Sequence, residues 1–234
     1  KTTADIREIP VFASMWNMDG LILMGFCEAD YEALRSQTRI SFVVYDGYFA
    51  ACSKVVNLTI GHYDGGYQAG QYARELGHTK ALCLADNDLC MDKERMDGFR
   101  AAFAPGKALF WQIPALQKER SAYYAEHFRG FLNLHSAVVF AASDFYALDF
   151  MRFLQTKGVR IPDDVQIIGS DDTAASRESV PTLTTVHQDA AQRAKTALAC
   201  LEAISSGREC EAQIVLPVTL IPRESTRKMP CRTL

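Results

Sequence analysis

The sequence predicts an α/β fold built on parallel sheets. Short apolar runs rich in β-branched residues alternate with helical patterns of roughly 10 to 15 residues, and this alternation is typical of strand–helix–strand units. Of the 234 residues, 48% are hydrophobic, which is enough to bury a substantial core. The length fits either one large domain or two lobes of ordinary size.

The expected elements follow one another along the whole chain. The predicted strands are Leu21–Met24, Ser41–Tyr45, Val55–Thr59, Ala81–Leu84, Ala108–Gln112, Ala137–Phe140, Val165–Gly169 and Ile214–Leu220. The predicted helices are Asp64–Leu76, Lys93–Phe103, Ser121–Leu132, Ala147–Lys157 and Ala190–Ser205.

Residues at the element boundaries support this assignment. Gly77 and Gly158 follow helical patterns as C-terminal stops, and Asp144 precedes one as an expected N-cap. Pro162 and Pro181 interrupt the pattern where loops are expected. The polar and basic segment Arg223–Leu234 is expected to be a loosely held end.

Composition argues against several classes of protein. No run reaches the roughly 20 apolar residues of a membrane span, and no basic-plus-apolar leader opens the chain. Seven scattered cysteines without a Cys-x-x-Cys pair favour a reducing cytoplasm over a disulfide framework. The formal net charge of −3 gives no overall attraction to nucleic acid. We therefore expect a cytoplasmic protein with no membrane partner, and any DNA-reading part would lie elsewhere.

Polar residues directly after predicted strands are the first candidates for a binding site. In open parallel sheets, ligands bind at the carboxyl ends of the strands, where the loops converge. The positions to consider are Asp46, Asp86–Arg95, Gln117–Ser121, Ser143–Asp144 and Asp171–Asp172.

Several motifs follow one another at these strand ends. They are Asp19-Gly20-Leu-Ile-Leu, Phe42-Val-Val-Tyr-Asp46, Gly65-Gly66 through Leu76-Gly77-His78, Glu94-Arg95-Met-Asp-Gly98-Phe99, Ala141-Ala-Ser-Asp144-Phe-Tyr-Ala147, Gly158 through Ile161-Pro-Asp-Asp-Val-Gln-Ile-Ile-Gly-Ser-Asp171-Asp172, Pro181-Thr-Leu-Thr-Thr-Val-His-Gln-Asp189, and Leu216-Pro through Ile221-Pro-Arg223-Glu-Ser-Thr226. In this order and spacing, the chain resembles the effector-binding domain of the lac repressor (LacI/GalR) family over about residues 18 to 226.

The resemblance implies a type I periplasmic-binding-protein-like fold, with two Rossmann-like lobes whose parallel sheets are joined by three crossovers. Residues 1–61 plus 188–211 would form the N-terminal lobe, and residues 62–187 plus 212–226 the C-terminal lobe, with 227–234 as a tail. The family's helix-turn-helix headpiece is absent from this chain. Only 18 residues precede Asp19, so the first lobe is expected to be incomplete at its start. Gly61 stands where the family usually has an Asp.

Arg95 and Asp171 are the leading candidates for effector contacts. The guanidinium of Arg95 can donate paired hydrogen bonds to sugar hydroxyls, a carboxylate or a phosphate, and the matching family position contacts effectors. The carboxylate of Asp171 can accept hydrogen bonds from two adjacent hydroxyls. The alternatives are a solvated Arg on the first turn of a helix and a turn or cap acid.

Four further residues are weaker candidates. Ser143 is expected to face the cleft, and Asp144 to be either a ligand residue or a helix cap. Asp46 is a strand-end acid that could equally cap the next segment. Cys90 lies in a strand-end loop, although lone cysteines are usually inert.

The aromatic and histidine positions bear on the effector's chemistry. An aromatic platform could come from Trp16, Tyr48, Trp111 or Tyr123, although such residues are more often core. The family's aromatic contact falls near Gln117–Ser121, which is polar here, so a charged effector such as a sugar phosphate is an alternative to a simple hexose. No metal or cofactor is expected, because no metal-ligand spacing connects the histidines, which are His62, His78, His127, His135 and His187.

The resemblance therefore implies the ligand-sensing domain of a DNA-binding regulator rather than an enzyme. It would bind a sugar or sugar-like effector between the lobes, form a homodimer, and reach operator DNA through a headpiece that is not in this chain. Whether the effector releases or promotes DNA binding stays open.

Two other functions are alternatives to this interpretation. An extracytoplasmic sugar-binding protein of a transport system shares the fold, but the cysteine count and the absence of a leader argue against it. An aspartyl-phosphate phosphatase is favoured only by Asp86-Asn87-Asp88-Leu89-Cys90, in which Cys90 replaces the required Thr.

Overall fold

The computed structural model describes residues 3–47, 55–132 and 137–228 and divides the chain into two compact units. Unit 1 combines Lys1–Gly61 with Asp189–Pro217, and unit 2 combines His62–Gln188 with Val218–Leu234. The chain therefore passes between the units three times. The predicted α/β fold with parallel sheets and three crossovers is confirmed.

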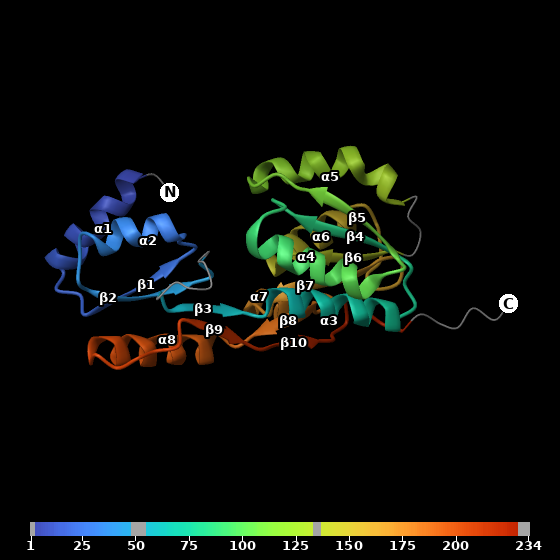
Figure 1. Cartoon of the computed structure of the whole chain (residues 1–234). Helices are drawn as coiled ribbons and strands as arrows, with labels where there is room; N and C mark the ends of the chain where they lie inside the picture. The colour runs from blue at the N-terminus through green and yellow to red at the C-terminus, as the bar shows by residue number, and fades with distance from the viewer. Residues whose placement is uncertain (1–2, 48–54, 133–136, 229–234) are drawn as a thin grey trace. The chain divides into compact units, whose positions relative to one another are not determined.

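Unit 1 is a sheet of parallel strands with helices on both faces (Figure 1). The sheet order is β1 (Gly20–Met24), β2 (Ser41–Tyr45), β3 (Asn57–Ile60) and β9 (Gln213–Leu216). The helices are α1 (Thr3–Met15), α2 (Glu28–Arg35) and α8 (Ala190–Ser205). Because side chains alternate along a strand, Phe42 and Val44 pack with Leu34 of α2, whereas Val43 packs with Ala197 of α8.

Unit 2 contains the larger sheet. Its strand order is β10 (Val218–Ile221), β8 (Thr184–Gln188), β7 (Gln166–Asp171), β6 (Val138–Ala141), β4 (Lys80–Ala85) and β5 (Lys107–Gln112). All pairs are parallel except β10 with β8. The helices are α3 (His62–Glu75), α4 (Cys90–Phe103), α5 (Gln117–Leu132), α6 (Asp144–Thr156) and α7 (Ala174–Glu178). The carboxyl ends of β4, β6 and β7 therefore lie at one edge, where a ligand site is expected.

Helices α3 and α4 pack against each other at unusually short range. A Cβ atom on Gly66 would lie 1.9 Å from the carbonyl oxygen of Arg95, and one on Gly98 would lie 2.0 Å from that of Tyr63. Only glycine allows this approach, because any side chain would collide with backbone. The two helices are thus held backbone to backbone beside the ligand edge of the sheet.

The last predicted strand is divided between the units. Instead of one strand over Ile214–Leu220, β9 pairs with β3 in unit 1 and β10 pairs with β8 in unit 2, with Pro217 between them. Residues 212–217 consequently lie in unit 1 rather than in the expected second lobe, and Gln188 ends a strand of unit 2. Strand pairing, which the local pattern does not specify, decides both boundaries.

The segment that begins at Arg223 is not a loosely held end, and this expectation is wrong for residues 223–227. Ser225 is fully buried and donates through its hydroxyl to the carbonyl of Ile167 at 2.6 Å. Arg223 donates to the carbonyl of Leu183 at 2.9 Å. These hydrogen bonds fasten the segment to the sheet of unit 2, while residues 229–234 lie outside the described part of the chain.

Among the described residues, none of the helices combines the length and the apolar character needed to cross a bilayer.

Candidate functional site

Two of the sequence-predicted residues meet at the carboxyl edge of the unit 2 sheet. Arg95 comes from α4, which follows β4, and Asp171 is the last residue of β7. Arg95 Nη1 lies 3.3 Å from Asp171 Oδ1, so the two side chains form an ion pair. Strands β4 and β7 are separated in the sheet by β6, and the long side chain of Arg95 crosses this distance.

The guanidinium of Arg95 is held from two sides. Its Nε donates to Nδ1 of His62 at 3.2 Å. Its Nη1 donates to the carbonyl of Ala142, which follows β6, and to Asp171. Arg95 is only 8% exposed, and no described residue accepts from Nη2. The side chain thus has a fixed plane and one donor group left for a ligand.

Asp171 is a carboxylate with an altered acidity. Burial raises the pKa of Asp171 to about 6, with a further contribution from Asp144, while Arg95 opposes the shift. Gln188, the last residue of β8, donates to Asp171 Oδ1 at 2.5 Å. The side chain of Asp171 remains 28% exposed, so its carboxylate is both polarised by neighbours and open to a ligand.

A second group of acids lies in the loop after β4. Asn87 Nδ2 donates to Asp86 Oδ1 at 2.6 Å and to Asp92 Oδ2 at 3.3 Å, which bridges the two carboxyl groups. Burial raises the pKa of Asp92 to about 6, Arg95 lowers it, and Asp86 raises it further. Burial raises the pKa of Tyr146 on α6, and the charges of Asp86 and Asp92 raise it further. Asp92 thus lies within the electrostatic field of both Arg95 and Asp86.

Ser143 has the cap role that was expected for Asp144. Ser143 is the N-cap of α6 and accepts from the backbone N–H of Tyr146 at 3.4 Å. Asp144 is fully buried, and its Oδ2 accepts from the backbone N–H of Thr173 at 2.8 Å while its Oδ1 accepts from the hydroxyl of Thr185. The predicted cap at Asp144 is therefore wrong, because this carboxylate fastens the start of α7 to β8.

The other two predicted residues lie in different surroundings. Asp46 follows β2 in unit 1, where it pairs with Arg193 Nη2 at 2.8 Å and accepts from the hydroxyl of Thr59 at 2.9 Å. Cys90 is the first residue of α4 and is an exposed free thiol. Effector binding by either residue stays a prediction.

Asp172, next to Asp171, has a structural role, because its carboxylate is held by side chains from other parts of unit 2. Although burial raises its pKa, hydrogen bonds from Arg223 and His187 hold the pKa of Asp172 below its usual range. Arg177 is a second cation beside Arg223, with Nη1 3.1 Å from Oδ2. The carboxylate joins three segments of unit 2, which leaves Asp171 as the acid available to a ligand.

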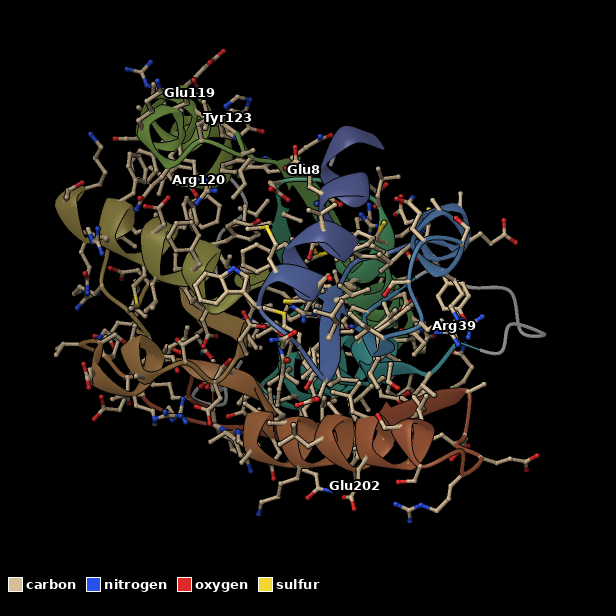
Figure 2. The ribbon with its side chains drawn as sticks, turned by 90° about the vertical axis from the view of Figure 1, so that its left-hand side faces the viewer. Glu8, Arg39, Glu119, Arg120, Tyr123 and Glu202 are labelled. Carbon is tan, nitrogen blue, oxygen red and sulfur yellow. The ribbon has the colours of Figure 1, made fainter. Side chains whose placement is uncertain are left out.

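Of the four aromatic residues proposed as platforms, Trp111 and Tyr123 pack against each other in unit 2. Trp111 is 8% exposed and packs edge-to-face on Tyr123 and Phe131 in the core, Trp16 lies on the surface of unit 1, and Tyr48 lies outside the described residues. In the polar segment Gln117–Ser121, Arg120 points from α5 towards α6 (Figure 2).

Arg120 is a buried structural residue. Its guanidinium carbon lies 4.8 Å from the ring centroids of both Phe145 and Tyr146. It donates to the carbonyls of Pro114 and Ala115 at 2.7 and 2.8 Å. Arg120 therefore holds the loop before α5 against α6. Tyr146 lies within the electrostatic field of Asp86 and Asp92 at the ligand edge.

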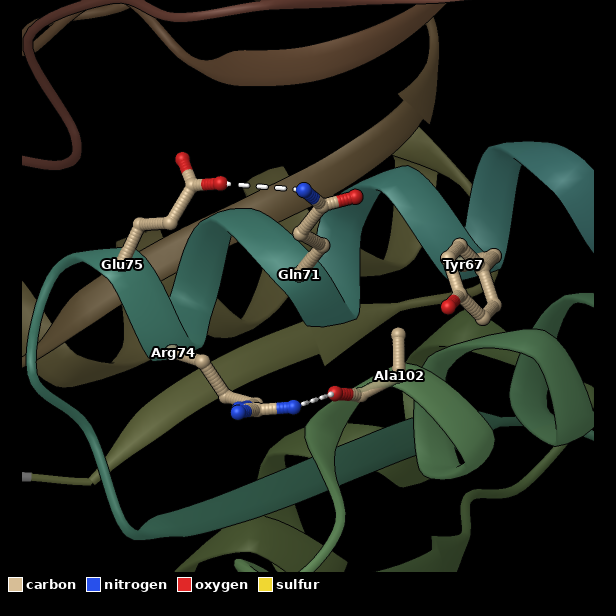
Figure 3. A pocket seen from close by; sticks show the side chains of 5 residues that line it. All are labelled: Tyr67, Gln71, Arg74, Glu75 and Ala102. Carbon is tan, nitrogen blue, oxygen red and sulfur yellow. Dashed lines mark hydrogen bonds between the residues drawn. The ribbon is translucent and has the colours of Figure 1, made fainter.

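A separate surface hollow lies over α3 and α4 (Figure 3). It has a volume of about 430 Å³ and is lined by Tyr67, Gln71, Arg74, Glu75 and Ala102. Its polar groups largely satisfy one another, because Gln71 donates to Glu75 and Arg74 donates to the carbonyl of Ala102. Neither Arg95 nor Asp171 lines it, so we do not assign the effector to this hollow.

Sequence reasoning missed His62 and Gln188, the residues that hold Arg95 and Asp171. The sequence offers His62 only as one of the histidines without metal-ligand spacing, and Gln188 only as the residue at a lobe boundary. A local signal exists for Gln188, because it directly precedes Asp189, the N-cap of α8, and so lies at a strand end. The role of His62 depends on packing between α3 and α4, and the sequence contains no signal for it.

Comparisons with known proteins identify relatives of this chain. Residues 71–226 match the periplasmic binding protein-like domain family. The HTH-type transcriptional repressor PurR of Vibrio cholerae is 33% identical over 155 residues, which are 64% of this chain and 46% of that protein. The chain thus spans about half the length of this curated relative.

Solved structures share the fold. A periplasmic binding protein/LacI transcriptional regulator from Alkaliphilus metalliredigens, complexed with D-xylulofuranose, has a TM-score of 0.81 at 24% identity, covering 95% of this chain and 83% of that one. A dimeric lac repressor has a TM-score of 0.81 at 20% identity, covering 97% and 84%. These likenesses show a shared fold, and the family match over residues 71–226 places the chain in the periplasmic binding protein-like domain family.

Proposed function

We propose that this chain is the ligand-sensing part of a transcriptional regulator and that it binds a sugar or sugar-like effector. The observation that carries the proposal is the ion pair of Arg95 and Asp171 at the carboxyl edge of the unit 2 sheet. An Arg and an Asp side by side present donors and acceptors together, and vicinal hydroxyl groups need both. The pair lies where ligands bind in open parallel sheets.

The charges favour a neutral polyhydroxyl effector over a sugar phosphate. Asp171 pairs with Arg95, Asp92 lies within the field of Arg95, and Asp86 lies beside Asp92, while Arg95 Nη1 is already engaged. A phosphate would meet these carboxylates at short range, and like charges in a partly buried site repel strongly. Sugar hydroxyls can instead donate to the carboxylates and accept from Arg95 Nη2.

The proposed regulatory role extends beyond this chain. The Vibrio cholerae relative is a repressor and one structural neighbour is a dimer, so we propose a cytoplasmic homodimer that reaches operator DNA through a headpiece outside these residues. The effector would change operator affinity only through its different affinity for two arrangements of the protein. Catalysis has no part in this proposal.

A thermal-shift screen tests the sensing function. The purified chain is melted with sugars, sugar phosphates, nucleosides and amino acids, and hits are titrated by calorimetry. A compound that binds only the folded chain adds about 2.7 kcal/mol of stability at a hundredfold excess over its Kd. Neutral sugars should raise the melting temperature more than their phosphates. A nucleoside or amino acid as the only hit would contradict the assigned effector class.

Variants on α4 locate the site. Arg95→Ala should weaken binding of the hit by about a hundredfold, the order expected when a buried charged partner is removed. Arg95→Lys keeps the charge but not the paired donors, so it should bind weakly while folding normally. Arg100→Ala is the matched control, because Arg100 lies on the same helix and contacts Asp97 and the ring of Phe110 rather than Asp171. Equal affinity of the wild type and both Arg95 variants would remove Arg95 from the site.

A further inference from the structure

His62 of unit 2 contacts Arg95, the leading candidate for effector binding. His62 is the first residue of α3 and is 4% exposed. Its Nδ1 lies 3.2 Å from Nε of Arg95, which donates to it. The chain enters unit 2 at His62, directly after the first crossover.

The chemistry of this contact fixes the protonation of the imidazole. A guanidinium group can only donate hydrogen bonds, so the Nδ1 atom must carry a lone pair rather than a proton. The imidazole is therefore neutral, with its proton on Nε2. A protonated His62 could not accept from Arg95 and would place two cations in contact.

The contact also fixes the plane of the guanidinium. Nε is held by His62 at one end, and Nη1 is held by the carbonyl of Ala142 and by Asp171 at the other. Two anchored nitrogens of a planar group determine the direction of the third, Nη2. Without His62, the side chain would keep its charge and its pair with Asp171 but could rotate about the remaining contacts.

Packing between the helices keeps the two side chains at this distance. The carbonyl of Arg95 itself touches α3 at Gly66, and the carbonyl of Tyr63, the neighbour of His62, touches α4 at Gly98. Backbone contacts on both sides of the pair leave little freedom for α3 to move relative to α4.

We propose that His62 is a positioning residue that orients the guanidinium of Arg95 for the effector. The proposal rests on the proposed function for its link to effector binding, but the orientation itself is a property of the chain alone. Because His62 follows the first crossover, the backbone that leaves unit 1 leads directly to the residue that orients Arg95.

Nuclear magnetic resonance of the ¹⁵N-labelled full chain, without any added compound, tests the orientation. The Nε–Hε signal of Arg95 is assigned by its loss in Arg95→Lys. We expect this signal to exchange slowly with water, to disappear in His62→Phe and to return in His62→Asn, whose side-chain oxygen can accept in place of Nδ1. Long-range spectra of His62 should show the proton on Nε2. A proton on Nδ1, or an unchanged Arg95 signal in His62→Phe, overturns the proposal.

Calorimetric titration with D-xylulose, D-ribose and cellobiose adds the functional readout. For a sugar whose binding needs Arg95, His62→Phe should weaken affinity by about tenfold or more and His62→Asn should restore most of it, in line with loss of a charged hydrogen bond. His127→Phe, a matched exchange on α5, should leave affinity unchanged. If none of these sugars binds the wild type, the proposed effector class is in doubt while the magnetic resonance result still decides the role of His62. Undiminished binding by His62→Phe contradicts the positioning role.

Discussion

Each unit of the molecule ends a strand with an aspartate that pairs with an arginine, yet the two pairs differ in what they leave exposed. In unit 1, Asp46 follows β2 and pairs with Arg193 of α8 at 2.8 Å. In unit 2, Asp171 ends β7 and pairs with Arg95 of α4 at 3.3 Å. Both aspartates have a positive φ, 49° and 127°, which is uncommon for residues other than glycine.

The difference lies in burial and in the number of partners. The side chains of Asp46 and Arg193 are 8% and 12% exposed, and Arg193 also donates to the carbonyl of Leu58 and stacks 4.1 Å from the ring of Tyr45. The side chain of Asp171 is 28% exposed, and burial raises its pKa to about 6. The same two residue types therefore hold a sheet to a helix in unit 1 and form the candidate ligand site in unit 2.

The largest expected effect is a loss of stability when the Asp46–Arg193 pair of unit 1 is broken. Arg193→Ala removes the cation that lies 2.8 Å from the buried carboxylate of Asp46, and breaking such a pair should lower the free energy of unfolding by about 3 kcal/mol. Chemical denaturation measures the change. Arg208→Ala is the control, because the exposed pair of Arg208 with Glu202 on α8 should matter little. If Arg193→Ala were as stable as the wild type, the pair would have no structural role.

The next effect should fall on binding rather than on stability. Asp171→Asn removes the charge that accepts from effector hydroxyls, so the Kd of a hit from the thermal-shift screen should rise by about tenfold to a hundredfold. Asp46→Asn is the matched exchange in unit 1 and should change the Kd far less. If the two variants lose affinity equally, the contrast between the units fails and Asp46 is itself an effector residue.

A smaller effect should appear in the pH dependence of stability. The folded-state pKa values of Asp92 and Asp171, about 6, lie above the ordinary value of 3.8. The folded protein thus binds more protons than the unfolded chain between about pH 4 and pH 6, and these groups favour folding at low pH. Their contribution is lost as the pH rises through about 6, by about 1–2 kcal/mol after allowance for solvent screening.

Denaturation of wild type, Asp92→Asn and Asp171→Asn at several pH values isolates this contribution. Each variant lacks one titrating group, so its unfolding free energy should fall less steeply than that of the wild type between pH 4 and pH 7. Effector affinity of the wild type should change in the opposite direction, because ionised Asp171 is the better acceptor. Parallel pH profiles for all three proteins would show that neither acid is perturbed.

The smallest effect is expected for Cys90. Its thiol is exposed at the start of α4, so Cys90→Ser should change unfolding free energy by less than about 0.5 kcal/mol. We also expect effector affinity to stay within about twofold, because no described partner orients the thiol. Calorimetry with the same hit checks this, and a large loss of affinity would return Cys90 to the site.

Part of the candidate site was accessible from the sequence because strand-end position is a local property. Arg95 and Asp171 follow recognisable motifs, and the topology of an open parallel sheet brings such positions together. Asp144 was placed correctly in the chain but given the wrong role. Whether an acid at a helix start caps the helix or turns inward depends on neighbours, here Thr173 and Thr185, that are distant in sequence.

Several elements escaped prediction for identifiable reasons. Helix α1 contains Pro10, which normally interrupts a helix, and α2 has eight residues. Strand β8 is rich in Thr and His and lacks a continuous apolar run. Each is stabilised by packing or pairing in its unit rather than by a strong local preference.

The sequence by itself determined the α/β class, the order of most strands and helices, and the family, because these depend on apolar periodicity and on motifs read along the chain. The tertiary structure alone decided which residues of the site act on one another. The contact between His62 and Arg95 requires two helices to approach at glycines, and the division of the last strand at Pro217 requires pairing partners in both units. Such long-range contacts depend on how surfaces pack, and no short stretch of sequence specifies them.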